Sequence, residues 1–196
     1  MTLPNCEGDR TMNDRDDHLS VSQAGSSVVL RLRPWRSDDL PALVAAHRDP
    51  QLRRWLANSL ADEAEARRWL DAQAGGWDSA TRFSFAVVAD ENDQAPVGHV
   101  VVKVGTAGVA EVGYWTVARA RGRGIASRSL ETVSQWALSA QNLVRLNRLD
   151  LLHAEANQAS CRVAEKCGYI LHDLLPAAPP TFSARGHRHV RTQPGS

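Results

Sequence analysis

The stretch AEVGYWTVARARGRGIA, at residues 110–126, decides the fold. Its first half alternates in the manner of a strand, with Val112 and Tyr114 on one face and Glu111 and Trp115 on the other. Its second half holds two glycines and opens an amphipathic, helix-forming segment. The stretch therefore predicts a strand that passes through a glycine turn into a helix.

The glycine turn has the properties of a phosphate-binding site. Gly122 and Gly124 carry no Cβ, so the backbone can bend sharply and come close to a ligand. The first N–H groups of a helix have no intrahelical partner and lie at the positive end of its dipole. Arg119, Arg121 and Arg123 add formal positive charge. Taken alone, the turn also fits an Arg/Gly surface turn, and it lacks both the G-x-G-x-x-G and the G-K-[ST] patterns of nucleotide sites.

The turn does match the pattern R-x-x-G-x-A, at Arg121, Gly124 and Ala126. Directly after a strand that reads EVGYW, this pattern resembles the pyrophosphate-binding segment of the GNAT acetyltransferases. The resemblance implies that the turn binds the diphosphate of acetyl coenzyme A.

A second motif lies about thirty residues downstream. It consists of Asn157-Gln-Ala-Ser160, followed by Glu165-Lys-Cys-Gly-Tyr169. This pattern resembles the subgroup of ribosomal-protein N-terminal (alanine) acetyltransferases. The two motifs in this order are more specific than either alone, and the resemblance covers roughly residues 28 to 175.

Bulk properties exclude several classes of protein. The net charge of +1 gives no overall attraction to nucleic acids or acidic membranes. No stretch approaches the roughly 20 apolar residues of a membrane span, and the polar N-terminus lacks the apolar region of an export signal. We therefore expect a cytoplasmic protein with neither nucleic acid nor membrane as partner, and either a monomer or a homodimer.

The three cysteines indicate free thiols in a reducing compartment. Cys161 and Cys167 are six residues apart on an expected helix and face different sides, which favours packing over a disulfide, a metal site or a nucleophile. The histidines show no zinc spacing, and we assign His187 and His189 to the tail. We therefore expect no metal.

The expected fold is α+β, the GNAT fold, with about four helices on both faces of a mixed, mostly antiparallel sheet of about six strands. The strands are expected at residues 28–33, 82–89, 96–104, 110–117, 145–154 and 169–175, and the strand at 145–154 should return parallel to the strand at 110–117 because a helix crossover separates them. Residues 1–26 are expected to form a disordered leader and 27–175 the acetyltransferase domain. Residues 176–196 are expected to form a Pro-rich basic tail in which the family's seventh strand is weak or absent.

The resemblance assigns the donor site residue by residue. The turn contributes Arg121, Gly122, Arg123, Gly124, Ile125 and Ala126 to the diphosphate. The pantetheine arm is expected to pair like an extra strand with the backbone of Trp115, Thr116 and Val117. Asn157 is expected to contact or orient the same arm, with a plain helix N-cap as the alternative.

Two side chains are the candidates for proton transfer. Glu111 lies on the central strand shortly before the turn and could accept the amine proton through a water, unless it is only a solvated strand carboxylate. Many GNAT enzymes place a tyrosine just before the E-K-x-G segment, but this chain has Ala164 there. We therefore assign protonation of the leaving sulfur to Ser160, which is otherwise an ordinary polar helix residue. Trp55, Trp69 and Trp77 are expected either to shape the acceptor pocket or to anchor the core.

The resemblance thus implies an N-acetyltransferase that uses acetyl-CoA and acts on a primary amine, with a protein N-terminal α-amino group as the expected acceptor. Two alternatives stay open: the same chemistry on a small-molecule amine such as an antibiotic or polyamine, and a non-catalytic acyl-CoA-binding or regulatory domain.

Overall fold

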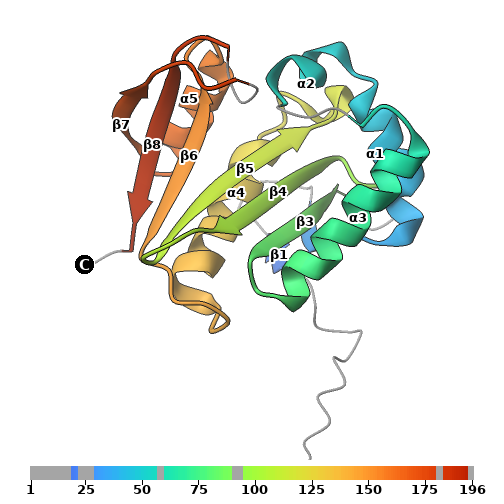
Figure 1. The fold of residues 1–196 in the computed structure, drawn as a ribbon, viewed down its shortest axis with the longest axis horizontal. Coiled ribbons are helices and arrows are strands. Elements are labelled where there is room, and N and C mark those ends of the chain that lie inside the picture. Colours follow the sequence, from blue (N-terminus) through green and yellow to red (C-terminus); the bar gives the residue numbers. More distant parts are fainter. Residues whose placement is uncertain (1–18, 22–28, 57–59, 90–94, 180–182, 194–196) are drawn as a thin grey trace, which may run out of the picture.

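The computed structural model describes residues 19–21, 29–56, 60–89, 95–179 and 183–193. Their strands form one sheet in the order β1-β2-β3-β4-β5-β6-β8-β7. The strands are β1 (Leu19–Val21), β2 (Leu30–Pro34), β3 (Arg82–Ala89), β4 (Gly98–Val104), β5 (Val109–Thr116), β6 (Arg148–Ala154), β7 (Ile170–Leu175) and β8 (Gly186–Thr192). Figure 1 shows this sheet twisting across the molecule.

Within the described ranges, five α-helices lie on the two faces of the sheet. They are α1 (Leu40–His47), α2 (Pro50–Trp55), α3 (Glu63–Asp78), α4 (Ile125–Gln135) and α5 (Gln158–Lys166). Short helical turns lie at Ser37–Asp39, Ala118–Ala120 and Trp136–Ala140. Neighbouring residues of β5 identify the faces: Trp115 contacts His47 of α1, whereas Tyr114 contacts Ser160 of α5. The helices α1 and α5 therefore lie on opposite faces.

The order of the strands follows from the lengths of their connections. The strands β3, β4 and β5 are joined by short connections as an antiparallel meander, and β2 pairs antiparallel with β3 although α1, α2 and α3 lie between them in the sequence. Between β5 and β6 the chain passes through α4, and β6 consequently runs parallel to β5, as predicted. The mixed, mostly antiparallel sheet with helices on both faces is thus confirmed, and the described residues form eight strands and five α-helices in place of about six and about four.

The strands β5 and β6 pair over only half of their length. Their register runs from Val109 opposite Arg148 to Val112 opposite Leu151 and ends there. Both strands continue, β5 to Thr116 and β6 to Ala154, while β5 stays paired with β4 as far as Thr116. The sheet therefore has a gap between the two interior strands β5 and β6, beyond the pair Val112 and Leu151.

The prediction of a weak or absent last strand was wrong. Strand β8 lies between β6 and β7 and pairs with both along their length. The residues that it turns toward α4 and α5 are His187, His189 and Arg191 rather than aliphatic side chains. Because the sequence lacks an apolar alternation here, the pattern indicated a tail.

The predicted leader was also wrong in part. Residues 19–21 form β1, which adds to the outer edge of β2 with Leu19 opposite Leu32. The half-buried Leu19 packs against the core. The other residues of the proposed leader lie outside the described residues.

Across the described ranges, no helix combines the length and the apolar character that crossing a membrane requires.

Candidate active site

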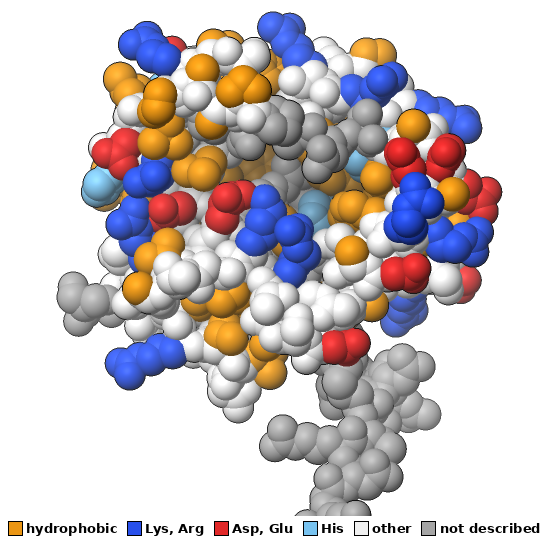
Figure 2. Space-filling view, in the orientation of Figure 1, with side chains coloured by type: hydrophobic (Ala, Val, Ile, Leu, Met, Phe, Trp, Pro, Cys, Tyr) orange, Lys and Arg blue, Asp and Glu red, His pale blue; other side chains and the backbone are white. Residues whose placement is uncertain are grey.

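A cleft of about 910 Å³ opens where β5 and β6 part. It is bounded by β5, the glycine turn, the first turn of α5, and side chains from α1, α2 and α3. Its described lining is strongly basic, with one carboxylate, Glu111, against Arg54, Arg82, Lys103, Arg121, Arg162 and Lys166. Figure 2 shows basic, acidic and hydrophobic side chains around a hollow in the middle of the molecule. This surplus of positive charge suits an anionic ligand.

The glycine turn lies at one end of the cleft and has the conformation that the sequence predicted. Gly122 and Gly124 both have φ of +73°, which a side chain would strain. A Cβ built on either glycine meets no protein atom within 4 Å, so the space beside both is open. Gly124 is the N-cap of α4, whose first backbone N–H groups have no intrahelical acceptor. The turn is therefore shaped to receive an anion from the cleft.

Arg121 makes two side-chain contacts that the sequence did not indicate. Its guanidinium is ion-paired with Asp49 and donates a hydrogen bond to Oε1 of Gln51 at 2.5 Å. Asp49 is also the N-cap of α2 and accepts from the Gln51 backbone N–H. Arg121 thus fastens α2 to the glycine turn, and Arg123 is the exposed arginine of the turn itself.

The unpaired edge of β5 offers backbone groups to the cleft. The N–H of Val117 donates to Val97, so the backbone of Val117 points toward the β4 side. Because backbone groups of a strand alternate in direction, those of Trp115 also point toward β4, and those of Tyr114 and Thr116 point into the gap. No described residue pairs with β5 on this side beyond Val112.

On the other side of the gap, Tyr114 and Ser160 form a hydrogen-bonded pair. The phenol of Tyr114 donates to Oγ of Ser160 at 3.1 Å, and Ser160 is nearly buried. Burial raises the pKa of Tyr114 to about 12, so the phenol stays protonated at neutral pH. Since Tyr114 supplies the proton of this bond, the hydroxyl proton of Ser160 is free for another acceptor. The sequence reading assigned no role to Tyr114.

Asn157 caps the helix that carries Ser160. Its Oδ1 accepts from the Ser160 backbone N–H at 3.4 Å, a long bond, while its backbone carbonyl accepts from the same group at 2.9 Å. Asn157 also lines the cleft. It therefore orients the first turn of α5 and remains within reach of a ligand.

Glu111 lies on the opposite face of β5 from Tyr114 and pairs with Lys103. The two residues are directly opposite each other on β5 and β4, and Nζ of Lys103 lies 2.5 Å from Oε1 of Glu111. Both side chains are 40% exposed. Glu111 therefore lines the cleft as one half of an ion pair that is open to solvent.

An aromatic wall completes this face of the cleft. The wall consists of Trp69, His99 and Trp115, which line the cleft, and Trp35, which contacts all three; the ring centroids in these contacts lie 5.4–5.9 Å apart. Burial lowers the pKa of His99 to about 3, and its Nδ1 accepts from Nε1 of Trp35. The ring of His99 is therefore neutral, and its lone pair is occupied.

His47 lies beside the wall and is also an unsuitable base. Burial lowers its pKa, and its Nδ1 accepts from the Leu60 backbone N–H at 3.2 Å. The proton of the neutral ring is therefore on Nε2, which has no partner among the described residues. His47 can donate into the cleft but has no free lone pair with which to accept a proton.

The three tryptophans singled out in the sequence separate into two groups. Trp55 and Trp69 line the cleft. Trp77 instead packs against Phe83, Phe85 and Trp136 and donates to the Ser84 carbonyl. Trp77 is therefore a core residue.

Comparison with known proteins agrees with this architecture. Residues 30–170 match the family described as Acetyltransferase (GNAT) domain. No curated protein sequence matches the chain.

Solved structures with the same fold include two ribosomal-protein acetyltransferases and one protein named RimJ. The ribosomal-protein-S5-alanine acetyltransferase of Vibrio fischeri has 18% identity and a TM-score of 0.75, with 90% of this chain and 98% of that chain covered. RimJ of Mycobacterium smegmatis, in complex with a CoA-disulfide, has 19% identity and a TM-score of 0.75, with coverage of 89% and 86%. RimL, a ribosomal L7/L12 α-N-protein acetyltransferase in complex with coenzyme A, has 18% identity and a TM-score of 0.72, with coverage of 91% and 100%. At these identities the likeness concerns the fold.

Proposed function

Because the chain belongs to the GNAT acetyltransferase family, we propose that it transfers the acetyl group of acetyl-CoA to a protein N-terminal α-amino group. The observation that carries this proposal is the gap between β5 and β6, with the glycine turn at one end and the Tyr114–Ser160 pair beside it. Since the reaction consumes acetyl-CoA, we propose the cytoplasm as its compartment.

The donor would lie along β5 with its diphosphate on the turn. The open space beside Gly122 and Gly124 admits the phosphates, and the helix N-terminus at Ile125 and Ala126 supplies N–H donors. The amide groups of the pantetheine arm can pair with the backbone of Tyr114 and Thr116, which points into the gap. The sequence predicted Trp115, Thr116 and Val117 for this pairing, but the backbone of Trp115 and Val117 points toward β4, so we propose Tyr114 and Thr116 instead.

We assign the two proton transfers of the reaction, from the amine and to the leaving sulfur, to opposite faces of β5. The bound ammonium group first gives one proton through a water to Glu111, the only carboxylate among the described lining residues, and the neutral amine then attacks the thioester carbonyl. The carbonyl oxygen of the tetrahedral intermediate accepts from backbone N–H groups at the β5 edge. When the C–S bond breaks, the sulfur takes the hydroxyl proton of Ser160, whose side chain Tyr114 holds in place. The nitrogen loses its second proton to solvent and Ser160 regains a proton from solvent, so that the products are a neutral amide and the free thiol. The amine thus enters from one face of the strand, and the thiolate is protonated from the other.

The proposed function is tested by a panel of amines with acetyl-CoA, following release of the coenzyme A thiol. Peptides that begin with Ala, Ser or Met are compared with small polyamines and aminoglycosides. The matched control is the same peptide with its α-amino group already acetylated and its lysines free. We expect many turnovers on the free peptide and none on the blocked one.

Two results would contradict the proposal. If only small amines are acetylated, the acceptor is a small-molecule amine and not a protein N-terminus. Tight binding of acetyl-CoA without turnover of any amine would indicate a sensor domain.

Glu111→Gln tests the proposed base through its pH profile. The variant keeps the shape and an oxygen acceptor for Lys103 but must wait for amine that is already neutral. At pH 7 only about a tenth of an α-amine with a pKa of about 8 is neutral, so we expect a loss of roughly tenfold in kcat/KM that largely disappears by pH 9. Glu63→Gln, at an exposed ion pair on α3, is the control. An equal loss at every pH would assign Glu111 to binding or structure instead.

A further inference from the structure

The face of the sheet beneath α5 carries a second group of chemically active side chains. It comprises His153, Cys161, His187 and His189, and we call it the His3Cys cluster. One ligand atom from each residue lies within 4.8 Å of each of the others. We propose that the His3Cys cluster binds one zinc ion.

The sheet topology explains how distant residues meet at this place. His153 on β6 lies directly opposite His187 on the antiparallel strand β8, so both side chains share a face. His189 is two residues further along β8 and shares that face as well. Cys161 descends onto them from α5, the helix that covers this side. The assignment of His187 and His189 to a tail was therefore wrong, and Cys161, which was expected only to pack, lies within reach of two imidazoles.

The distances suit tetrahedral zinc. The sulfur of Cys161 lies 3.3 Å from Nδ1 of His187 and 3.8 Å from Nε2 of His153. With Zn–S of about 2.3 Å and Zn–N of about 2.1 Å, the sulfur–nitrogen edge of a tetrahedron is about 3.6 Å. The two observed distances bracket this value. Four protein ligands leave no open position, which is the pattern of a structural zinc site.

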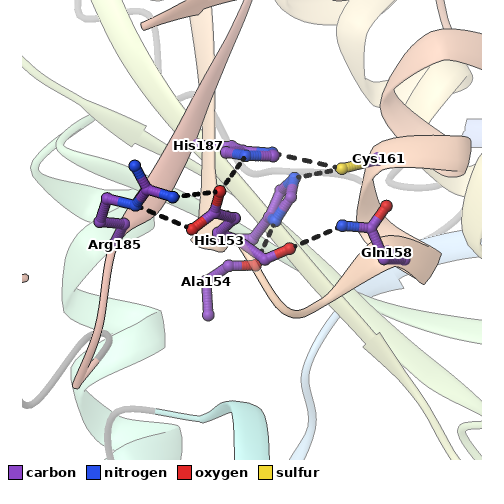
Figure 3. A network of polar contacts seen from close by, with 7 residues as sticks. His153, Ala154, Gln158, Cys161, Arg185 and His187 are labelled. Atoms are coloured by element: carbon purple, nitrogen blue, oxygen red, sulfur yellow. Dashed lines mark hydrogen bonds and ion pairs between the residues drawn. The ribbon is translucent and has the colours of Figure 1, made fainter. Parts of the chain in front are cut away.

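The groups around the cluster orient two of the rings toward a common centre. Nδ1 of His153 lies 2.8 Å from the carbonyl oxygen of Ala154, so a proton on Nδ1 leaves the lone pair of Nε2 facing Cys161. Nε2 of His187 lies 4.0 Å from the carboxylate of Glu155, which leaves Nδ1 facing the same sulfur. Arg185 holds that carboxylate with two hydrogen bonds of 3.1 Å. Figure 3 shows both rings beside Cys161, with Arg185 on the outer side. Carboxylates and carbonyls that receive the second N–H of a histidine are the usual support of a metal ligand.

His189 supplies an independent observation. Its side chain is 1% exposed, yet neither ring nitrogen has a hydrogen-bond partner among the described residues. Its ring stacks on His153, with centroids 5.1 Å apart. A buried imidazole without a partner loses the hydrogen bonds it makes in water, and a metal ion in the cluster would satisfy one nitrogen. Zinc is favoured because imidazole and thiolate are both good ligands for it. Binding would displace the thiol proton of Cys161 to solvent.

Such an ion would fix α5 to β6 and β8. Cys161 directly follows Ser160, and His153 itself lines the cleft. The ion would therefore stabilise the helical turn that presents Ser160, without itself touching the reacting atoms.

The test is metal content and cobalt spectroscopy of the whole chain. After reconstitution and removal of loose metal, we expect one zinc per chain, and substitution by Co²⁺ should give thiolate-to-metal charge-transfer absorption together with the intense visible bands of tetrahedral cobalt. Cys161→Ser should lose the charge-transfer absorption, and His189→Gln should lose the stoichiometric zinc. His172→Gln, an exposed histidine on β7 outside the cluster, should keep both.

Two further measurements keep the proposal testable if the ligand variants unfold. Chelation of the unaltered protein should lower its Tm by roughly 10 °C, and zinc should restore it. Glu155→Gln should weaken zinc about 10–100-fold while leaving the ligands intact. Zinc no higher in the unaltered protein than in Cys161→Ser, or a cobalt complex without charge-transfer absorption, overturns the proposal. The result is independent of acetyl transfer, because none of these readouts requires turnover.

Discussion

Gly124→Glu is expected to abolish binding of coenzyme A. Gly124 is the N-cap of α4 and has φ of +73°, and the space beside it is open. The new side chain would enter that space and bring a negative charge to the place where we put the diphosphate. Bulk and charge oppose the ligand together, so we expect affinity measured by calorimetry to fall by at least about 100-fold, or about 2.7 kcal/mol.

The controls separate loss of the site from strain of the backbone. A residue other than glycine at positive φ costs roughly 1–2 kcal/mol of stability. Gly168→Glu has the same charge and a similar strain, since Gly168 has φ of +70° and open space beside it but does not line the cleft. Gly124→Ala carries the strain without the charge. If the Gly124→Glu protein is folded and binds coenzyme A with the affinity of the unaltered chain, the assignment of the diphosphate to the glycine turn is wrong.

The sequence was most informative where the physical cause is local. The strand, the turn at Gly122 and Gly124 and the amphipathic helix can be predicted from the local sequence. The positive φ of the glycines and the unpaired N–H groups at the start of the helix depend only on neighbouring residues. Asn157 as an N-cap is predictable for the same reason. The antiparallel meander followed from short polar connections, and the parallel return followed from the intervening helix.

The remaining parts of the site depend on contacts between distant residues. Tyr114 and Ser160 are 46 positions apart, and the strand pattern gives only the face on which Tyr114 lies. Asp49 reaches Arg121 across 72 positions. Local sequence patterns predict neither of these two long-range contacts.

Strand β8 was missed for a different reason. Apolar alternation is the signal of a half-buried strand, and β8 puts His187 and His189 where aliphatic side chains are expected. The two histidines at these inward-facing positions of β8 are also members of the His3Cys cluster. The departure from the usual strand pattern is therefore itself an indication of a specialised site.

Ser160→Ala should lower kcat by about 100-fold, at the lower end of the range for general acid catalysis, with little change in the KM for acetyl-CoA. The variant removes the Ser160 hydroxyl. Because Tyr114 donates the proton of the hydrogen bond between the two residues, the proton of that hydroxyl is available to the leaving sulfur in the unaltered enzyme. Tyr114→Phe leaves that hydroxyl in place without its orienting partner, so we expect a smaller loss of about tenfold. Ser79→Ala, at the exposed end of α3, is the control for loss of a serine hydroxyl.

The nature of the leaving group provides the decisive measurement for Ser160. A thiolate of low basicity leaves without a proton, so an acetyl thioester of an acidic aromatic thiol should react nearly equally well with Ser160→Ala and with the unaltered enzyme. The deficit should then be specific to the basic thiolate of coenzyme A. If the variant is slowed equally with both thioesters, Ser160 positions the acyl group and does not protonate the sulfur. If it turns over acetyl-CoA at the unaltered rate, Ser160 is an ordinary polar residue of α5, and the leaving thiolate takes its proton from water.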